Sequence, residues 1–138
     1  MPSKLTIYSD GGARGNPGPA AIGILICDAK GGELQEHYET IGDTTNNVAE
    51  YMAVIVALEL AKKYKAQEIE YFVDSQLVER QIKGEYKVKT PHLQDLHQQV
   101  KQREKFFKLV RFHHVPREHA KLRIVDKLVN RALDEAGH

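Results

Sequence analysis

The stretch LTIYSDGGARGNPGPA, residues 5–20, decides how this chain is organised. Its first residues alternate, with Leu5 and Ile7 on one side, and this pattern predicts a strand over residues 4–10. The glycines and prolines of residues 11–19 then indicate a turn, and the apolar run after them indicates a second strand. The first strand therefore ends on Asp10, beside backbone that is free to approach a ligand. Such a place is suited to holding a metal ion or a phosphate.

Composition sets limits on the class of protein. The 138 residues are 41% hydrophobic and 28% charged, which is ordinary for a globular chain, and we expect one domain over residues 1–138. A net charge of +1 excludes a strong overall basic field, so binding to nucleic acid would need a local patch. Cys27, the one cysteine, is expected to be a buried thiol. With no leader-like start and no apolar run of membrane-spanning length, we expect a cytoplasmic protein without membrane contact.

Downstream patterns predict the element order βββαβααβα. The later strands are expected at residues 20–27, 33–42, 68–74 and 108–115, and the helices at 48–65, 75–84, 91–107 and 122–136. A strand–helix unit that follows a three-stranded meander predicts an α/β fold, with strands 1–3 antiparallel in a five-stranded mixed sheet and helices on both faces. The helix over 48–65 is apolar around most of its circumference and should be the central one.

Three acidic residues stand where a purely structural sequence would rarely put them. Asp10 and Asp74 each end a predicted strand, and ligands of α/β sheets gather at strand ends. Glu50 lies on the same predicted helix face as Val54 and Ala57, so it points towards the sheet, where a carboxylate needs a cation or hydrogen-bond donors. Taken singly, each acid has a structural explanation, as a cap or as an acid at a helix N-terminus.

Taken together, the three acids favour a metal site. Like charges that converge repel one another unless a cation occupies the space between them. The sequence offers no histidine–cysteine set for zinc, and an all-oxygen site suits Mg²⁺ or Mn²⁺. Asp126 is a fourth candidate, because it lies at the edge of the apolar arc of the closing helix, where a side chain can reach a cleft at the rim of the sheet. The alternative for Asp126 is a solvated helix acid.

Four segments then form a recognisable set: DGGARGNPGPAA (10–21), TTNNVAEYMAVIVAL (44–58), VDSQLV (73–78) and VPREH…VDKLVNRAL (115–133). Over nearly the whole chain they resemble ribonuclease H type 1, in the compact archaeal and bacterial form that lacks an inserted basic loop. The resemblance implies a ribonuclease H-like fold and an endonuclease that cuts the RNA strand of RNA–DNA hybrids to leave a 5′-phosphomonoester. It also implies two divalent ions, Mg²⁺ or Mn²⁺, bound by four acids. By motif these are Asp10, Glu50, Asp74 and Asp126.

The segment before Asp126 departs from the family pattern. REHAKLRIVD is about two residues longer than is usual there, which predicts a bulged loop or a later start of the closing helix. Within it, His119 matches the mobile loop histidine of the family, which assists water activation or product release. A solvated loop histidine is the alternative.

Choosing a hybrid over DNA requires contact with the 2′-hydroxyl from the wide minor groove. The glycine-rich turn and the start of the first helix supply groups that can approach it, and basic residues near the rim can contact phosphates. The candidate substrate contacts are Gly11, Gly12, Asn16, Thr45, Asn46, Asn47, Lys87 and Lys89. We expect a monomer that needs no obligate protein partner.

Three other functions are weighed against this one. The longer segment before Asp126 leaves open a catalytically impaired module of the same fold that binds hybrid or RNA. A nucleotide-binding protein fits poorly, because a phosphate-cradling loop opens a helix and this turn opens a strand. A resolvase- or integrase-like nuclease would share the acids but not the four segments.

Overall fold

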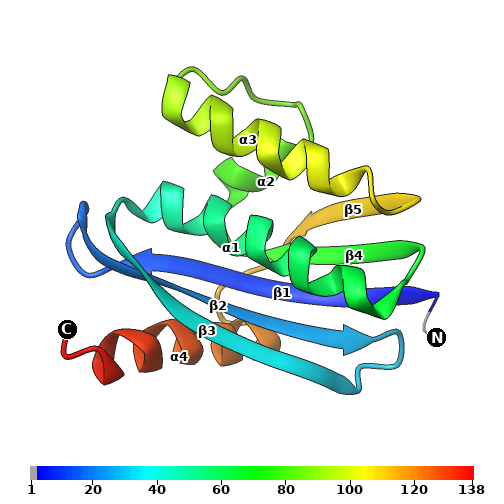
Figure 1. The fold of residues 1–138 in the computed structure, drawn as a ribbon, viewed down its shortest axis with the longest axis horizontal. Coiled ribbons are helices and arrows are strands. Elements are labelled where there is room, and N and C mark those ends of the chain that lie inside the picture. The colour runs from blue at the N-terminus through cyan, green and yellow to red at the C-terminus, as the bar shows by residue number, and fades with distance from the viewer. Residues whose placement is uncertain (1–2) are drawn as a thin grey trace.

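A computed structural model describes residues 3–138, and its centre is a five-stranded sheet in the order β3-β2-β1-β4-β5 (Figure 1). The strands are β1 (Lys4–Ala13), β2 (Gly18–Asp28), β3 (Glu33–Thr44), β4 (Glu68–Val73) and β5 (Leu109–His114). The helices are α1 (Asn46–Ala61), α2 (Gln76–Ile82), α3 (Pro91–Glu104) and α4 (Ala120–Glu135), and a short 3₁₀ helix η1 (Lys62–Tyr64) continues α1. The first three strands pair antiparallel, and β4 and β5 run parallel to β1. The predicted α/β fold and the element order βββαβααβα are confirmed.

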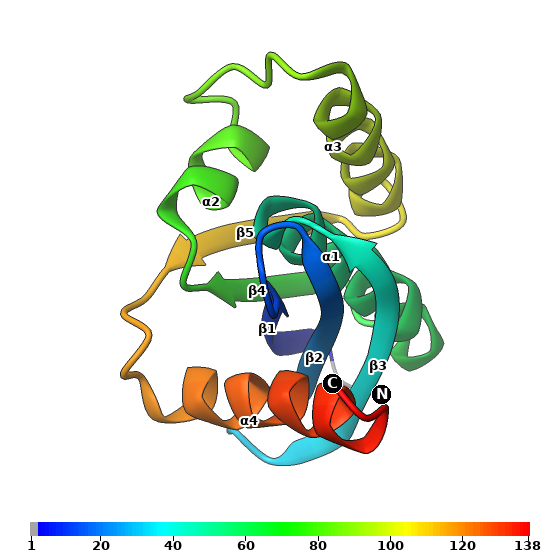
Figure 2. The same ribbon diagram turned by 90° about the vertical axis from the view of Figure 1, so that its left-hand side faces the viewer.

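Helices cover both faces of the sheet. Figure 2 shows α1 and α3 stacked on one face and α4 lying alone on the other. β2 is buried on both sides, because Ile24 and Ile26 pack in the cluster beneath α1, whereas Leu25 and Cys27 pack beneath α4. The thiol of Cys27 is free and buried, as expected. α1 lies between the sheet and α3, which explains why its sequence is apolar nearly all round. Within residues 3–138, no helix is both long and apolar enough to cross a membrane.

The end of the first strand differs from its prediction. β1 continues through Gly11 and Gly12 to Ala13, and β2 already begins at Gly18, so the turn is much shorter than predicted. The glycines pair with Ile22 and Ala21 in the antiparallel ladder, and this cross-strand pairing outweighs the low strand propensity of glycine. Asp10 therefore lies inside the strand and not at its end.

The start of the closing helix also differs. α4 begins at Ala120, two residues before the predicted start, so the added residues ahead of Asp126 form helix and not a bulged loop. His119 makes this early start possible, since its Nδ1 accepts a hydrogen bond from the Lys121 amide at 3.1 Å and caps the helix. Other boundaries shift by similar amounts: β3 runs on to Thr44, α1 begins at Asn46, and α1 and α3 each end a few residues before their predicted ends.

Candidate metal centre

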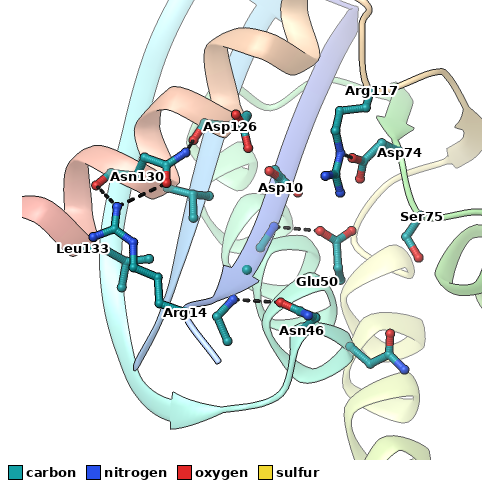
Figure 3. Close-up of a pocket in the computed structure, with 15 residues that line it drawn as sticks. Asp10, Arg14, Asn46, Glu50, Asp74, Ser75, Arg117, Asp126, Asn130 and Leu133 are labelled. Atoms are coloured by element: carbon teal, nitrogen blue, oxygen red, sulfur yellow. Dashed lines mark hydrogen bonds and ion pairs between the residues drawn. The ribbon is translucent and has the colours of Figure 1, made fainter. Parts of the chain in front are cut away.

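Three carboxylates meet at one place on the sheet. Asp10 of β1, Glu50 of α1 and Asp74 at the end of β4 each offer an oxygen within 4.8 Å of the others (Figure 3). Asp10 and Glu50 are each only 7% exposed. The structure thus brings together the three acids that the sequence pattern singled out, although they are far apart in the chain.

The packing of α1 explains where Glu50 points. Gly11 follows Asp10, and a Cβ atom at Gly11 would lie 2.2 Å from the backbone oxygen of Ala49. Because glycine carries no such atom, the first turns of α1 rest directly on β1. Glu50, the next residue, reaches the acid cluster, and its Oε1 accepts a hydrogen bond of 2.8 Å from the Gly11 amide.

Neither Asp10 nor Asp74 serves as the cap that was its alternative explanation, and Glu50 lies beyond the first turn of α1. The hydroxyl of Thr45 caps α1 by accepting from the Val48 amide at 3.2 Å, and the hydroxyl of Ser75 caps α2. Asp74 therefore does not cap α2, and Asp10 lies within a strand. The acids are left to face one another.

Their electrostatics match an incomplete cation site. Burial raises the pKa of Asp10 to about 6, and the negative charges of Asp74 and Asp126 also raise it. Burial and the charge of Asp10 raise the pKa of Glu50 well above its usual range. Clustered buried carboxylates are unfavourable when ionised, and a hard divalent cation removes that penalty. The three oxygen donors fit such an ion.

Asp126 approaches from the opposite face of the sheet. It lies on α4 and lines the same pocket as the other acids, a cavity of about 430 Å³, but stands outside their 4.8 Å group. Figure 3 shows Asp126 and Asn130 on the wall that α4 forms beside Asp10. The pocket therefore has acids on two sides.

The predicted substrate contacts divide into three groups. Gly11, Gly12, Asn46 and Asn47 line the acid pocket itself. Asn16 and Thr45 line an adjoining groove, which Asn46 and Asn47 also border. Lys87 and Lys89 are exposed on the link between α2 and α3, and neither lines the acid pocket.

His119 does not line the acid pocket either. Besides capping α4, its ring stacks on Tyr8 with the ring centroids 5.7 Å apart. Arg117, two residues earlier, is the residue of this loop that reaches the pocket, where its Nε lies 3.0 Å from Oδ2 of Asp74. The ion pair raises the pKa of Arg117. Arg117 belongs to the quoted segment VPREH but was given no role, because nothing in the local sequence places this loop arginine beside Asp74.

Arg14 and Asn130 also lie within quoted segments but were given no role. Both line the pocket, and Arg14 Nη2 lies 3.2 Å from Asn130 Oδ1. Arg14 stands in the stretch that decides the fold, but its partner is 116 positions away. No local signal could have joined them.

Comparison with known proteins places the chain among its relatives. The family described as "Reverse transcriptase-like" matches residues 8–132. Ribonuclease HI of Halobacterium salinarum is 43% identical over 133 residues, which are 96% of this chain and 66% of that protein. A bifunctional protein of Mycobacterium tuberculosis is 41% identical over 134 residues, which are 96% of this chain and 36% of that protein. The chain thus spans slightly less than two thirds of the first relative and about a third of the second.

Solved structures agree with the chain over nearly its full length. The crystal structure of RNase H1 from Halobacterium salinarum superposes with a TM-score of 0.91 at 40% identity and covers 96% of this chain and 98% of its own. LC11-RNase H1, solved in complex with an RNA/DNA hybrid, has a TM-score of 0.91 at 45% identity and covers 97% and 99%. The four sequence segments, the sheet order and these relatives agree: the chain belongs to the ribonuclease H type 1 family, in its compact form.

Proposed function

We propose that this chain is an endoribonuclease that hydrolyses the RNA strand of RNA–DNA hybrids, with two divalent ions, Mg²⁺ or Mn²⁺, held by its acids. One observation carries the proposal. Carboxylate oxygens of Asp10, Glu50 and Asp74 lie within 4.8 Å of one another, in a pocket that Asp126 also lines. A relative at 45% identity, LC11-RNase H1, has been solved with a hybrid bound, which supports the choice of substrate.

The position of each acid suggests its role. Asp10 comes from the central strand and stands between the other carboxylates, so it would help to hold both ions. Glu50 and Asp74 would complete the shell of one ion, and Asp126 would serve the other. Two ions in such a site activate the attacking water and stabilise the leaving 3′-oxygen. The cleavage product would carry a 5′-phosphate.

Arg117 is the cationic side chain that pairs with one of the clustered acids. Its guanidinium pairs with Asp74 and lines the pocket, so it would face a phosphate that enters. His119 holds the first turn of α4 and stacks on Tyr8, and its proposed part in water activation or product release would require the loop to move. We therefore assign the direct electrostatic role to Arg117 and keep His119 as a candidate.

Some of the proposed substrate contacts already have partners within the protein. Asn46 Oδ1 accepts from the Ala13 amide at 2.8 Å, and the Thr45 hydroxyl caps α1. Their remaining donors, together with the side chain of Asn47, are the groups left for the 2′-hydroxyls and phosphates of the substrate. A Cβ atom at Gly12 would meet Val129 and Asn46 at ordinary van der Waals distances of 3.8 and 3.9 Å, so Gly12 lies beside Asn46 in the wall of the pocket.

The test is a cleavage assay with strand-labelled RNA–DNA hybrid, duplex DNA and duplex RNA, each with Mg²⁺ and with Mn²⁺. We expect cleavage of the RNA strand of the hybrid alone, lost on chelation of the metal. Asp10→Asn should lower the rate by more than about 100-fold, the upper range for loss of a residue that merely supports a ligand. A fully active Asp10→Asn variant would contradict the assignment of the site.

The same assay decides the alternative of an impaired binding module. That alternative drew on the longer segment before Asp126, but these residues form helix and Asp126 lines the pocket. Binding of hybrid without cleavage in either metal would favour the module over the nuclease.

A further inference from the structure

Asp126 is held differently from Glu50 and Asp74. Among residues 3–138 its carboxylate has no hydrogen-bond or ion-pair partner, whereas Glu50 accepts from the Gly11 amide and Asp74 pairs with Arg117. Asp126 also belongs to the helix on the other face of the sheet from α1. Its place in the pocket therefore depends on how the middle of α4 is fixed.

Arg14 ties the hairpin between β1 and β2 to α4. Its Nη2 lies 2.8 Å from Oδ1 of Asp134 and 3.2 Å from Oδ1 of Asn130, and its Nη1 donates to the backbone oxygen of His138. These acceptors all belong to the C-terminal half of α4 or the residues just after it. A guanidinium is favoured there, because the C-terminal end of a helix carries a partial negative charge.

Asn130 continues this connection to Asp126. While its Oδ1 accepts from Arg14, its Nδ2 donates to the backbone oxygen of Asp126 at 3.0 Å. Figure 3 shows the resulting chain of contacts from Arg14 through Asn130 to Asp126 along one wall of the pocket. The side-chain amide of Asn130 is thus oriented from both ends.

The backbone from which Arg14 extends is itself tightly held. The Arg14 amide donates to the Pro19 oxygen at 2.8 Å and closes the hairpin. A Cβ atom at Gly18 would lie 2.1 Å from the Arg14 oxygen, so only glycine lets the two sides of the turn come this close. The arginine therefore reaches α4 from a fixed point.

We infer that Arg14 is a positioning residue for Asp126: acting through Asn130, it holds the middle of α4 against the acid pocket and so strengthens the binding of the ion that Asp126 ligates. This inference rests on the proposed function. Direct contact between Arg14 and a substrate phosphate is the competing role. The structure favours it less, because the carboxylate of Asp134 and three further oxygens already occupy the guanidinium.

The test compares Arg14→Met with Arg131→Met. Arg131 is a matched control, since it lies on α4 and pairs with Glu135 at 2.8 Å but does not line the pocket. In calorimetric titrations with Mn²⁺, Arg14→Met should weaken binding of the ion that Asp126 ligates by about tenfold, the lower range for residues that orient a ligand. Amide exchange of residues 126–130 should become faster in the metal-free variant, and Arg131→Met should change neither property.

Kinetics on the hybrid separate the two roles of Arg14. Positioning predicts that Arg14→Met raises the Mn²⁺ concentration for half-maximal cleavage and lowers kcat, with KM for the hybrid little changed. Asn130→Ala should act the same way, and the double variant should be no worse than either single one. A raised KM with unchanged Mn²⁺ dependence would overturn the inference in favour of phosphate contact.

Two further outcomes are distinguishable. If Arg14→Met does not fold, Asp134→Asn removes only the ion pair at an exposed carboxylate and should weaken Mn²⁺ binding to a smaller extent; unchanged binding would overturn the inference. If the wild-type chain does not cleave hybrid, the proposed function fails. The Mn²⁺ titration and amide exchange then still test the role of Arg14. Unchanged Mn²⁺ affinity and unchanged exchange rates in Arg14→Met would refute that role.

Discussion

Gly23 lies opposite Asp10 in the antiparallel ladder of β1 and β2, and the backbone of α4 passes directly over it. A Cβ atom at Gly23 would lie 2.4 Å from the backbone oxygen of Val125. Asp126 is the next residue of α4, so this close approach is what brings the fourth acid near the first.

The other face of the sheet repeats the arrangement. Gly11 follows Asp10, the α1 backbone rests on it at Ala49, and Glu50 is the next residue. Two glycines beside Asp10 thus let two helices approach from opposite faces, and each helix delivers an acid one residue beyond its point of contact.

Gly23→Ala should therefore cost both stability and the placement of Asp126. The added methyl group overlaps backbone, which cannot rotate away as a flexible side chain does, and overpacking of this kind costs about 1–3 kcal/mol. Urea unfolding measures the loss. Gly12→Ala is the control for stability, because the nearest atom to its added Cβ is 3.8 Å away. Equal stability of the Gly23→Ala and Gly12→Ala variants would show that α4 does not rest on the strand as described.

Metal-free stability should fall as pH rises. Burial and neighbouring charges raise the pKa of Asp10 to about 6 in the folded chain, so the folded state binds this proton more tightly than the unfolded state does. The stabilisation is complete below the unfolded pKa of about 4 and is lost as pH rises through about 6. In the presence of a chelator at about pH 8, the free energy of unfolding of Asp10→Asn should exceed that of the wild type by on the order of 2 kcal/mol. At about pH 4 the two proteins should have similar free energies of unfolding.

Thermal unfolding at the two pH values checks this expectation, and divalent metal should abolish the difference by stabilising only the wild type. A pH-independent difference between the two proteins would contradict the burial of a charged cluster.

Removing Arg117 should separate metal affinity from turnover. Its guanidinium competes with a cation for Asp74, but the arginine side chain is 76% exposed, so the competition is weak. Arg117→Met should tighten Mn²⁺ binding by no more than about fivefold, the equivalent of roughly 1 kcal/mol, while kcat on the hybrid falls. Calorimetry and steady-state kinetics measure the two effects. Weaker Mn²⁺ binding in this variant would show that Arg117 supports the acids instead of competing for them.

The basic residues of the link between α2 and α3 are expected to contact phosphates. With a net charge of only +1, affinity for hybrid should depend on such local groups and fall steeply with salt. Replacing both Lys87 and Lys89 with Met should weaken hybrid binding and reduce the slope of log affinity against log salt by about 1.5. Replacing Lys105 and Lys108 instead should leave the slope unchanged. The reverse result would move the phosphate contacts to Lys105 and Lys108.

The sheet, the helix order and three of the acids could be predicted because they leave local signals. Alternation of Leu5 and Ile7 marks β1, and Asp10, Glu50 and Asp74 each interrupt an apolar pattern, which made them conspicuous. Their convergence follows from the layered fold, in which the middle strand, the end of β4 and the start of the central helix meet.

Features that depend on distant partners were beyond such reasoning. The glycines after Asp10 read as a turn because their pairing with β2 is invisible in a local window. The early start of α4 depends on the side chain of His119, and Arg117 matters only because Asp74 lies 43 positions away. In each case the deciding contact is tertiary.

The most direct test of the account is a crystal structure of the wild-type chain in complex with Mn²⁺ and an RNA–DNA hybrid whose scissile linkage cannot be hydrolysed. Anomalous scattering locates the ions without ambiguity. We predict two Mn²⁺ peaks about 4 Å apart, both in contact with Asp10, one also with Glu50 and Asp74 and the other also with Asp126. Peaks away from these four acids, or a single ion with Asp126 turned out of the pocket, would contradict it.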